Sequence, residues 1–232
     1  MNDHPYSFGR TGAVSTIETR NRVLRNTYWL LALSMISMVL GAYVGLVTGF
    51  SLFAATSPAM SMLAFFAIAF GFMFPIQKTK DSAAGLFVLL GFTFFMGLML
   101  SHILSFMLGF SNGPSLIMLA FGGTGVIFVS MATIATISKR DFSGLDKWLF
   151  MGVIVLLLAS VANVFLHLPA LMLTASVMAI VIFSAYMLFD VQRVVNGGET
   201  NYITATLAIY LDLYNVFVNL LALLGIFGGN RN

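Results

Sequence analysis

Two aspartates, Asp190 and Asp212, stand in otherwise apolar runs in the last quarter of the sequence. Asn196, Gly197 and Gly198 lie between them and predict a turn, because glycine readily accepts a positive φ angle and asparagine tolerates it. Two helices joined by this turn would form a hairpin. At a rise of about 1.5 Å per residue, the two carboxyl groups would differ in depth by only about one helical turn. The spacing therefore predicts that Asp190 and Asp212 can meet inside the molecule.

A carboxyl pair held away from water would share a proton, since like-charge repulsion and lost solvation both oppose a double negative charge. Loss of that proton would draw in a cation or water, which would link acidity to ion permeation. Asp190 and Asp212 are thus a predicted pH-sensing ion gate and a possible weak calcium site, to which Asn215 could add a carbonyl oxygen. The simpler alternative for Asp190 is a local ion pair with Arg193, three residues further on.

Other polar residues in apolar segments have more than one interpretation. Asp212, Asn215 and Asn219 recur at i, i+3 and i+7, so they predict a polar stripe that faces the bundle interior and supports the gate. Alternatively, the asparagines only form hydrogen bonds between helices. His102 and His167 fall near predicted helix ends and are expected to be interfacial residues, or else pH sensors.

A carboxyl pair on neighbouring membrane helices could also belong to an intramembrane aspartyl protease, in which the pair activates water. Such enzymes share a Gly-x-Gly-Asp pattern, whereas Asp212 follows Tyr210 and Leu211 here. We therefore expect no catalysis. We also expect no organic cofactor, and calcium enters only as a possible permeant ion.

The composition excludes an ordinary water-soluble domain. Hydrophobic residues make up 59% of the chain and charged residues 8%, against about 25% charged residues in soluble proteins, and the mean hydropathy is +0.98. The net charge of +3 is too small and scattered for nucleic-acid binding, and the absence of cysteine excludes disulfides and thiolate metal sites. With about 20 residues per span, 232 residues leave room for seven spans and short loops.

The expected fold is an all-α integral membrane protein, a seven-transmembrane helix bundle. Pro58, Pro114 and Pro169 each fit the first turn of a helix, where a missing N–H does no harm. The expected organisation is a cytosolic N-terminal tail (1–25), a transmembrane domain (26–228) and a C-terminal tail (229–232). The seven spans are expected at 26–47, 58–76, 83–108, 114–137, 147–166, 169–195 and 203–227.

Two groups of glycines in these spans predict helix packing. Gly41, Gly45 and Gly49 follow one another at four-residue spacing and could seat a neighbouring helix. The cluster at Gly122, Gly123 and Gly125 lacks the Lys-Ser/Thr of a phosphate-binding loop and is also interpreted as packing.

The distribution of Lys and Arg predicts the orientation. Between the spans, these residues lie in or beside three of the six connections, and the other three connections carry none. Because cytoplasmic loops are enriched in Lys and Arg, the N-terminus is predicted inside and the C-terminus outside, unless the last span is re-entrant. The residues concerned are Lys78, Lys80, Lys139, Arg140, Lys147 and Arg193.

Three segments resemble the Bax inhibitor-1 family, in particular its bacterial YccA-like branch. They are VLRNTYWLLALSM (Val23 to Met35), the Phe-Asp-x-Gln at 189–192, and the run from Gly197 to Gly225, within a resemblance that covers about residues 22–228. This implies a seven-helix bundle with the last helix at its centre. In calcium-leak members, aspartates matching Asp190 and Asp212 form a proton-sharing latch, bonded by an arginine on the second helix. Residues 58–76 contain no arginine.

The resemblance to the YccA-like branch implies a second function, which is to bind and restrain the membrane-bound AAA protease FtsH in the bacterial cytoplasmic membrane. The polar segment 1–25 is long enough to offer such a protease a cytosolic handle. Two hypotheses therefore follow from the sequence, a protease modulator and a pH-sensitive calcium or cation leak.

Overall fold

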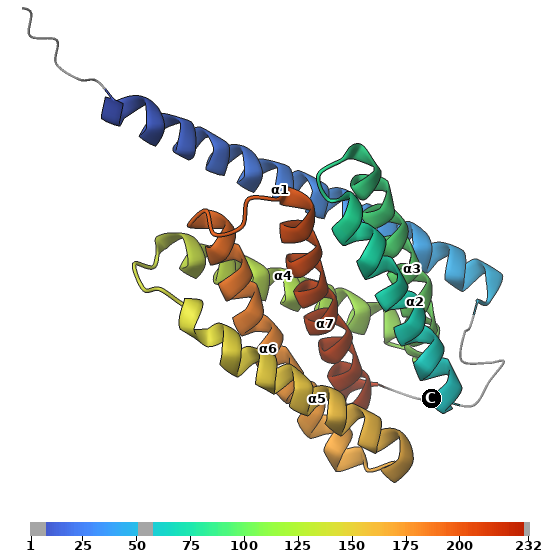
Figure 1. The fold of residues 1–232 in the computed structure, drawn as a ribbon. Helices are drawn as coiled ribbons and strands as arrows, with labels where there is room; N and C mark the ends of the chain where they lie inside the picture. Colours follow the sequence, from blue (N-terminus) through green and yellow to red (C-terminus); the bar gives the residue numbers. More distant parts are fainter. Residues whose placement is uncertain (1–7, 51–57, 230–232) are drawn as a thin grey trace, which may run out of the picture.

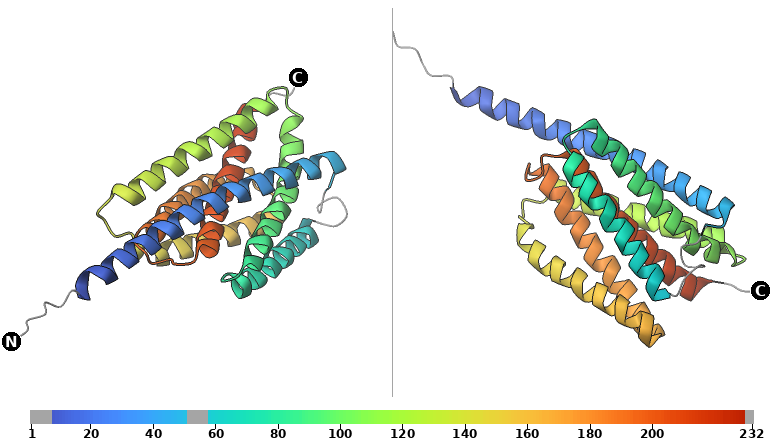
Figure 2. Two further views of the ribbon diagram at one scale, coloured as in Figure 1. Left: turned by 90° about the horizontal axis from the view of Figure 1, so that it is seen from above. Right: turned by 45° about the vertical axis from the view of Figure 1, so that its right-hand side comes forward.

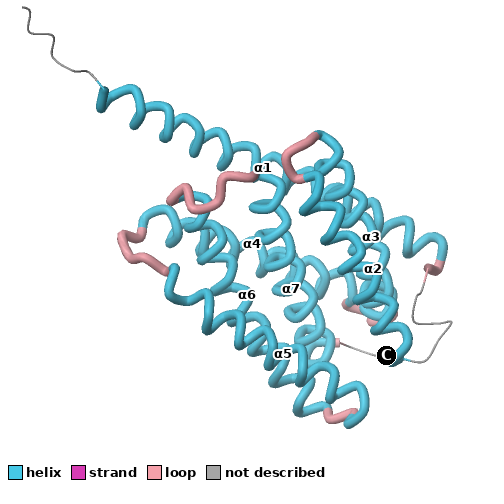
Figure 3. The backbone as a smooth tube through the Cα atoms, viewed as in Figure 1, coloured by secondary structure: helices cyan, strands magenta, loops and turns pink. Residues whose placement is uncertain are grey.

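The structure is a computed structural model that describes the backbone of residues 8–50 and 58–229, and the side chains of residues 18–50 and 60–229. Within these ranges the chain is helical without strands, and short loops join seven long helices (Figures 1 and 3). Each is long and apolar enough to cross a membrane, which confirms the predicted fold class. The helices are α1 (Phe8–Thr48), α2 (Pro58–Thr79), α3 (Ala83–Leu108), α4 (Gly113–Ile137), α5 (Asp146–Leu166), α6 (Pro169–Val195) and α7 (Tyr202–Gly228), with a short 3-10 turn, η1 (Ser143–Leu145), before α5.

The first helix is the main departure from the expected spans. It begins at Phe8 and continues without a break, so residues 8–25, expected to form a tail, are helical, and this end projects beyond the other helices (Figures 1 and 2). Val23 packs in a small buried cluster with Val194 of α6 and Ala205 of α7. This contact fixes the helix before the apolar run begins. Residues 1–7 and 230–232, including Arg231, lie outside the described residues.

Helix α7 lies at the centre of the bundle and contacts α6, α4, α1, α3 and α2 (Figure 2). Its side chains are buried all along its length, from Ile203 through Tyr210 to Leu221. The helix is capped by Asn201, whose side-chain oxygen accepts from the backbone N–H groups of Ile203 and Thr204. A helix surrounded by helices can be apolar all round, which explains the continuous apolar run in its sequence.

Glycines allow α1 and α3 to pack at very short range. A Cβ at Gly41 would collide with the carbonyl of Phe94, and a Cβ at Gly97 would collide with the carbonyl of Met38. A Cβ at Gly45 would collide with the side chain of Ser101 of α3, so the predicted role of Gly41 and Gly45 is correct.

The packing prediction was wrong for three other glycines. Gly49 has a φ of +64° and no neighbour within 4 Å of a Cβ, so it ends α1 instead of seating a helix. Gly122 and Gly125 of α4 also face open space, because they point away from the bundle. Of that cluster, Gly123 alone approaches another helix, with Leu220 of α7 3.5 Å from its Cβ position.

Candidate functional site

Asp190 of α6 and Asp212 of α7 lie within hydrogen-bonding reach of each other. Asp212 is only 4% exposed, and its Oδ2 atom has no partner among the described residues. A carboxylate can only accept hydrogen bonds, so two carboxyl groups bond to each other only when one carries a proton. The turn thus brings the two carboxyl groups close together, and a shared proton stays a prediction.

One side of the pair opens into a cavity of about 370 Å³ between α2, α6, α7 and the α6–α7 turn, here called the basic-end cavity. Asp190 lines it together with Arg193, Lys80 and Glu199, whereas Asp212 lies behind. The cavity lies at the end of the bundle where the α2–α3, α4–α5 and α6–α7 connections are found, here called the basic end (Figure 1). Solvent can therefore approach the pair from the basic end.

A second cavity, of about 400 Å³, lies between α2, α5, α6 and α7 and is here called the polar cavity. Asn215 and Asn219 line it, with Ser160, Asn163 and Ser176 opposite. Each α7 asparagine donates a side-chain N–H to a carbonyl of its own helix at 2.8 Å, and among the described residues neither amide bonds to another helix. The residues of the predicted polar stripe therefore lie in two different places. Asp212 faces α6, whereas Asn215 and Asn219 line a cavity that does not include Asp190.

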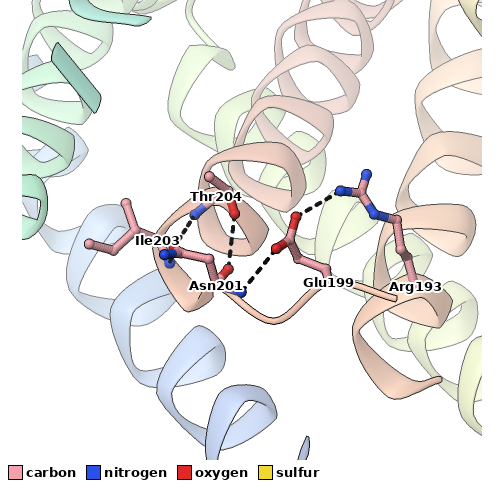
Figure 4. A network of polar contacts seen from close by, with 5 residues as sticks. All are labelled: Arg193, Glu199, Asn201, Ile203 and Thr204. Carbon is pink, nitrogen blue, oxygen red and sulfur yellow. Dashed lines mark hydrogen bonds and ion pairs between the residues drawn. The ribbon is translucent and has the colours of Figure 1, made fainter. Parts of the chain in front are cut away.

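Arg193 does not form the predicted ion pair with Asp190. Its guanidinium donates to Oε2 of Glu199 at 2.7 Å, and Oε1 of Glu199 accepts from the backbone N–H of Asn201 at 2.9 Å (Figure 4). The reason is the turn itself, which places Glu199 over the last turn of α6. Arg193 still acts electrostatically on Asp190.

Asn201 joins the α6–α7 turn to the α2–α3 connection. Besides capping α7, its side-chain N–H group donates to the carbonyl of Lys80 at 2.9 Å and to Oδ1 of Asp81 at 2.8 Å. The bonds inside the turn are shown in Figure 4. This contact fixes one wall of the basic-end cavity.

Gln192 holds the α4–α5 connection and was missed in the sequence analysis. It is only 4% exposed; its amide donates to the carbonyl of Arg140 at 2.7 Å and accepts from the N–H of Phe142 at 2.8 Å. In the same loop, hydrogen bonds from the backbone and hydroxyl of Ser143 lower the pKa of Asp141. The partners of Gln192 are backbone groups about fifty residues earlier in the chain, so no sequence pattern marks the contact.

The carboxyl pair does not fit a resident calcium site. Calcium prefers about six to eight oxygen ligands, and Asn215, the expected further ligand, lines the polar cavity instead of the cavity of Asp190. Among residues 18–50 and 60–229, no three His, Asp or Glu side chains gather in a way that could hold a metal.

His102 and His167 lie on elements other than those that carry the pair. His102 lines a larger cavity of about 1080 Å³ with Phe106, Phe110 and Gly225, and that cavity includes no residue of the pair. His167 ends α5 with a φ of 52°, a left-handed conformation. Neither histidine lines the basic-end cavity.

Comparisons with known proteins agree with this architecture. The family model described as "Inhibitor of apoptosis-promoting Bax1" matches residues 20–229. An uncharacterized membrane protein of Vibrio cholerae is 37% identical over 224 residues, which are 96% of this chain and 97% of that protein. The Escherichia coli K12 protein named "Modulator of FtsH protease YccA" is 36% identical over 219 residues, 94% of each chain.

A protein of E. coli O6:H1 named "Inner membrane protein YccA" matches to the same extent, 36% over 219 residues. The family match covers most of the first helix, the carboxyl pair and the central last helix. The chain is therefore a multi-pass membrane protein of the Bax inhibitor-1 family.

Proposed function

We propose that this protein binds an FtsH-type membrane protease in the bacterial inner membrane and restrains its turnover of membrane proteins. The observation that carries the proposal is the 36% identity, over 94% of each chain, with the E. coli modulator of FtsH protease. Because both chains align almost from end to end, the proposal concerns the whole protein instead of one shared segment.

The orientation that this function requires follows from the charge distribution. All Lys and Arg residues of the loops lie at the basic end, which we assign to the cytoplasm by the positive-inside rule. The projecting end of α1 lies at this same end (Figures 1 and 2). A tag at either terminus, probed with a membrane-impermeant reagent, tests the assignment, and a reactive N-terminal tag in intact spheroplasts would overturn it.

The projecting end of α1 is the surface that we assign to the protease. Arg20 and Arg22 are exposed there, and the first contact of α1 with the buried cluster is made by Val23. AAA proteases grip accessible chain ends, and a chain end that projects from the fold is the part most easily gripped. Deletion of residues 2–22 therefore removes the candidate handle but keeps the contact that positions the helix.

The test measures the half-life of a membrane protein degraded by FtsH in a strain that lacks its own YccA-like protein. Expression of the full-length chain should lengthen the half-life, and the variant without residues 2–22 should not, although it accumulates in the membrane to the same level. An unchanged half-life with the full-length chain would contradict the proposal.

A second candidate function is a pH-sensitive cation leak gated by Asp190 and Asp212. It is favoured by the carboxyl pair, which a binding protein does not need, and by the basic-end cavity in front of Asp190. Calcium flux into proteoliposomes, measured between about pH 5 and 8, should depend on pH and should change in Asp190→Asn and Asp212→Asn. Flux equal to that of empty liposomes throughout would exclude this function.

A further inference from the structure

The α6–α7 turn gives Glu199 an unusually fixed position over the end of α6. The carbonyl of Arg193 accepts hydrogen bonds from the N–H groups of Gly198 at 2.8 Å and Glu199 at 3.1 Å, and Gly197 supplies the positive φ that the turn requires. Asn201 then fixes the carboxylate of Glu199 by donating its backbone N–H. The side chain of Glu199 is only 16% exposed. Its position therefore does not depend on Arg193 alone (Figure 4).

Arg193 has two acidic neighbours that compete for its guanidinium. Asp190 precedes it by three residues on α6, a spacing at which opposite charges on a helix normally meet. The guanidinium instead bonds to Glu199 at 2.7 Å. Among the described residues this is the one ion pair between side chains, and Asp190 is left within hydrogen-bonding reach of Asp212.

Other charged and titratable groups lie near Asp190, but none is as well placed as Arg193 to form an ion pair with it. Asp146, at the start of α5, acts electrostatically on Asp190, and both aspartates of the pair act on Tyr186, one turn earlier than Asp190 on α6. Lys80 lines the same cavity from the end of α2. Arg193 is therefore the cation best placed to move onto Asp190.

We propose that Glu199 is a positioning residue that holds the Arg193 guanidinium away from Asp190 and so sets the pH at which the Asp190–Asp212 pair loses its proton. This rests on the proton-sharing pair of the second proposed function, but not on ion permeation. When Glu199 is neutral, Arg193 turns towards Asp190 and stabilises its carboxylate. The pair then releases its proton at a lower pH.

The test is a pH titration of the purified protein in lipid, which follows the infrared carbonyl band of a protonated carboxyl group. Asp212→Asn identifies the band, since it removes the pair. Relative to wild type, Glu199→Gln should lower the midpoint by roughly one pH unit, and Arg193→Gln should raise it. Lys78→Gln, whose ammonium lies 5.3 Å from the Phe74 ring centroid and does not line the cavity, is the matched control and should leave it unchanged.

The double variant Glu199→Gln/Arg193→Gln separates positioning from a simple change of charge. With no guanidinium to relocate, its midpoint should be higher than the sum of the two single shifts predicts. Additive shifts would overturn the positioning role and leave the shared proton in place. If wild type shows no band that Asp212→Asn removes, the shared proton itself is wrong and the proposal falls with it.

Discussion

The two sides of the bundle around α7 are built in opposite ways. On the close-packed side, formed by α1 and α3, glycines bring two backbones into direct contact at Gly41, Gly45 and Gly97. On the polar side, formed by α2, α5 and α6, the helices leave the polar cavity and the basic-end cavity, and the carboxyl pair lies between α6 and α7. The difference indicates that the α1–α3 contact forms a rigid support, while the carboxyl pair lies on the polar side. The larger cavity at His102 lies near the end of α3, away from the glycine contact.

The largest effect is expected at the α1–α3 contact. Gly97→Leu should destabilise the protein by about 3 kcal/mol, because the new side chain meets the backbone of Met38 and Ala42, which cannot move aside as a flexible side chain can. Thermal unfolding in detergent measures this. Gly125→Leu on α4 is the control, since a Cβ there meets nothing within 4 Å. Equal stability of the two variants would mean that the glycine contact does not hold the two helices together.

A smaller effect is expected at Gln192, which bonds to the α4–α5 loop. Gln192→Met keeps a similar side-chain volume but loses both hydrogen bonds to the α4–α5 loop, at a cost of about 1 to 2 kcal/mol. Trypsin should then cut after Lys139 or Arg140 roughly tenfold faster. Gln77→Met, at an exposed glutamine of α2, should leave the cutting rate unchanged. If both variants were cut at the wild-type rate, Gln192 would not hold the α4–α5 loop in place.

A modest gain in stability is expected at the α5–α6 turn. His167 has a left-handed φ of 52°, so His167→Gly should stabilise the protein by about 0.5 to 1 kcal/mol. Gly197 has a φ of 79° in the α6–α7 turn. Gly197→Ala puts a side chain at this positive φ and should therefore lower the melting temperature. If His167→Gly is destabilising, the imidazole contributes more at this site than its hydrogen-bonding reach to the carbonyl of Phe165 suggests.

The smallest effect is expected in the polar cavity. Asn219→Leu should cost less than about 1 kcal/mol, because the leucine enters a cavity of about 400 Å³ and the lost bond is local to α7. Ala120→Leu, at a fully buried position of α4, introduces the same side chain where there is no room and should be clearly worse. Similar melting temperatures for the two variants would show that the polar side is as tightly packed as the rest.

The sequence was most informative where a residue type contrasts with its surroundings. Asp190 and Asp212 are rare charges in apolar runs, and their spacing from a glycine turn was enough to predict their meeting. The partner of Gly41 and Gly45 was not predicted, although Thr93, Gly97 and Ser101 repeat at the same four-residue spacing and could have indicated α3.

The network around the pair was harder to predict because its members bond to backbone or across long sequence separations. Arg193 was assigned to Asp190 from i, i+3 spacing, but the turn that brings Glu199 over α6 decides its partner. The early start of α1, at Phe8, was missed because residues 8–25 are polar. The contact of Val23 with α6 and α7, which the sequence does not reveal, supports this part of the helix. Local patterns predict which residues are unusual, whereas loop geometry decides which of them meet.

The central claim is that the protein restrains an FtsH-type protease through the projecting end of α1. The carboxyl pair is not needed for this restraint. The most direct measurement is the rate at which such a protease degrades a membrane substrate in proteoliposomes, with and without this protein. Wild type and Asp212→Asn should both slow degradation, and the variant without residues 2–22 should not. Degradation at the same rate with and without the wild-type protein would contradict the claim.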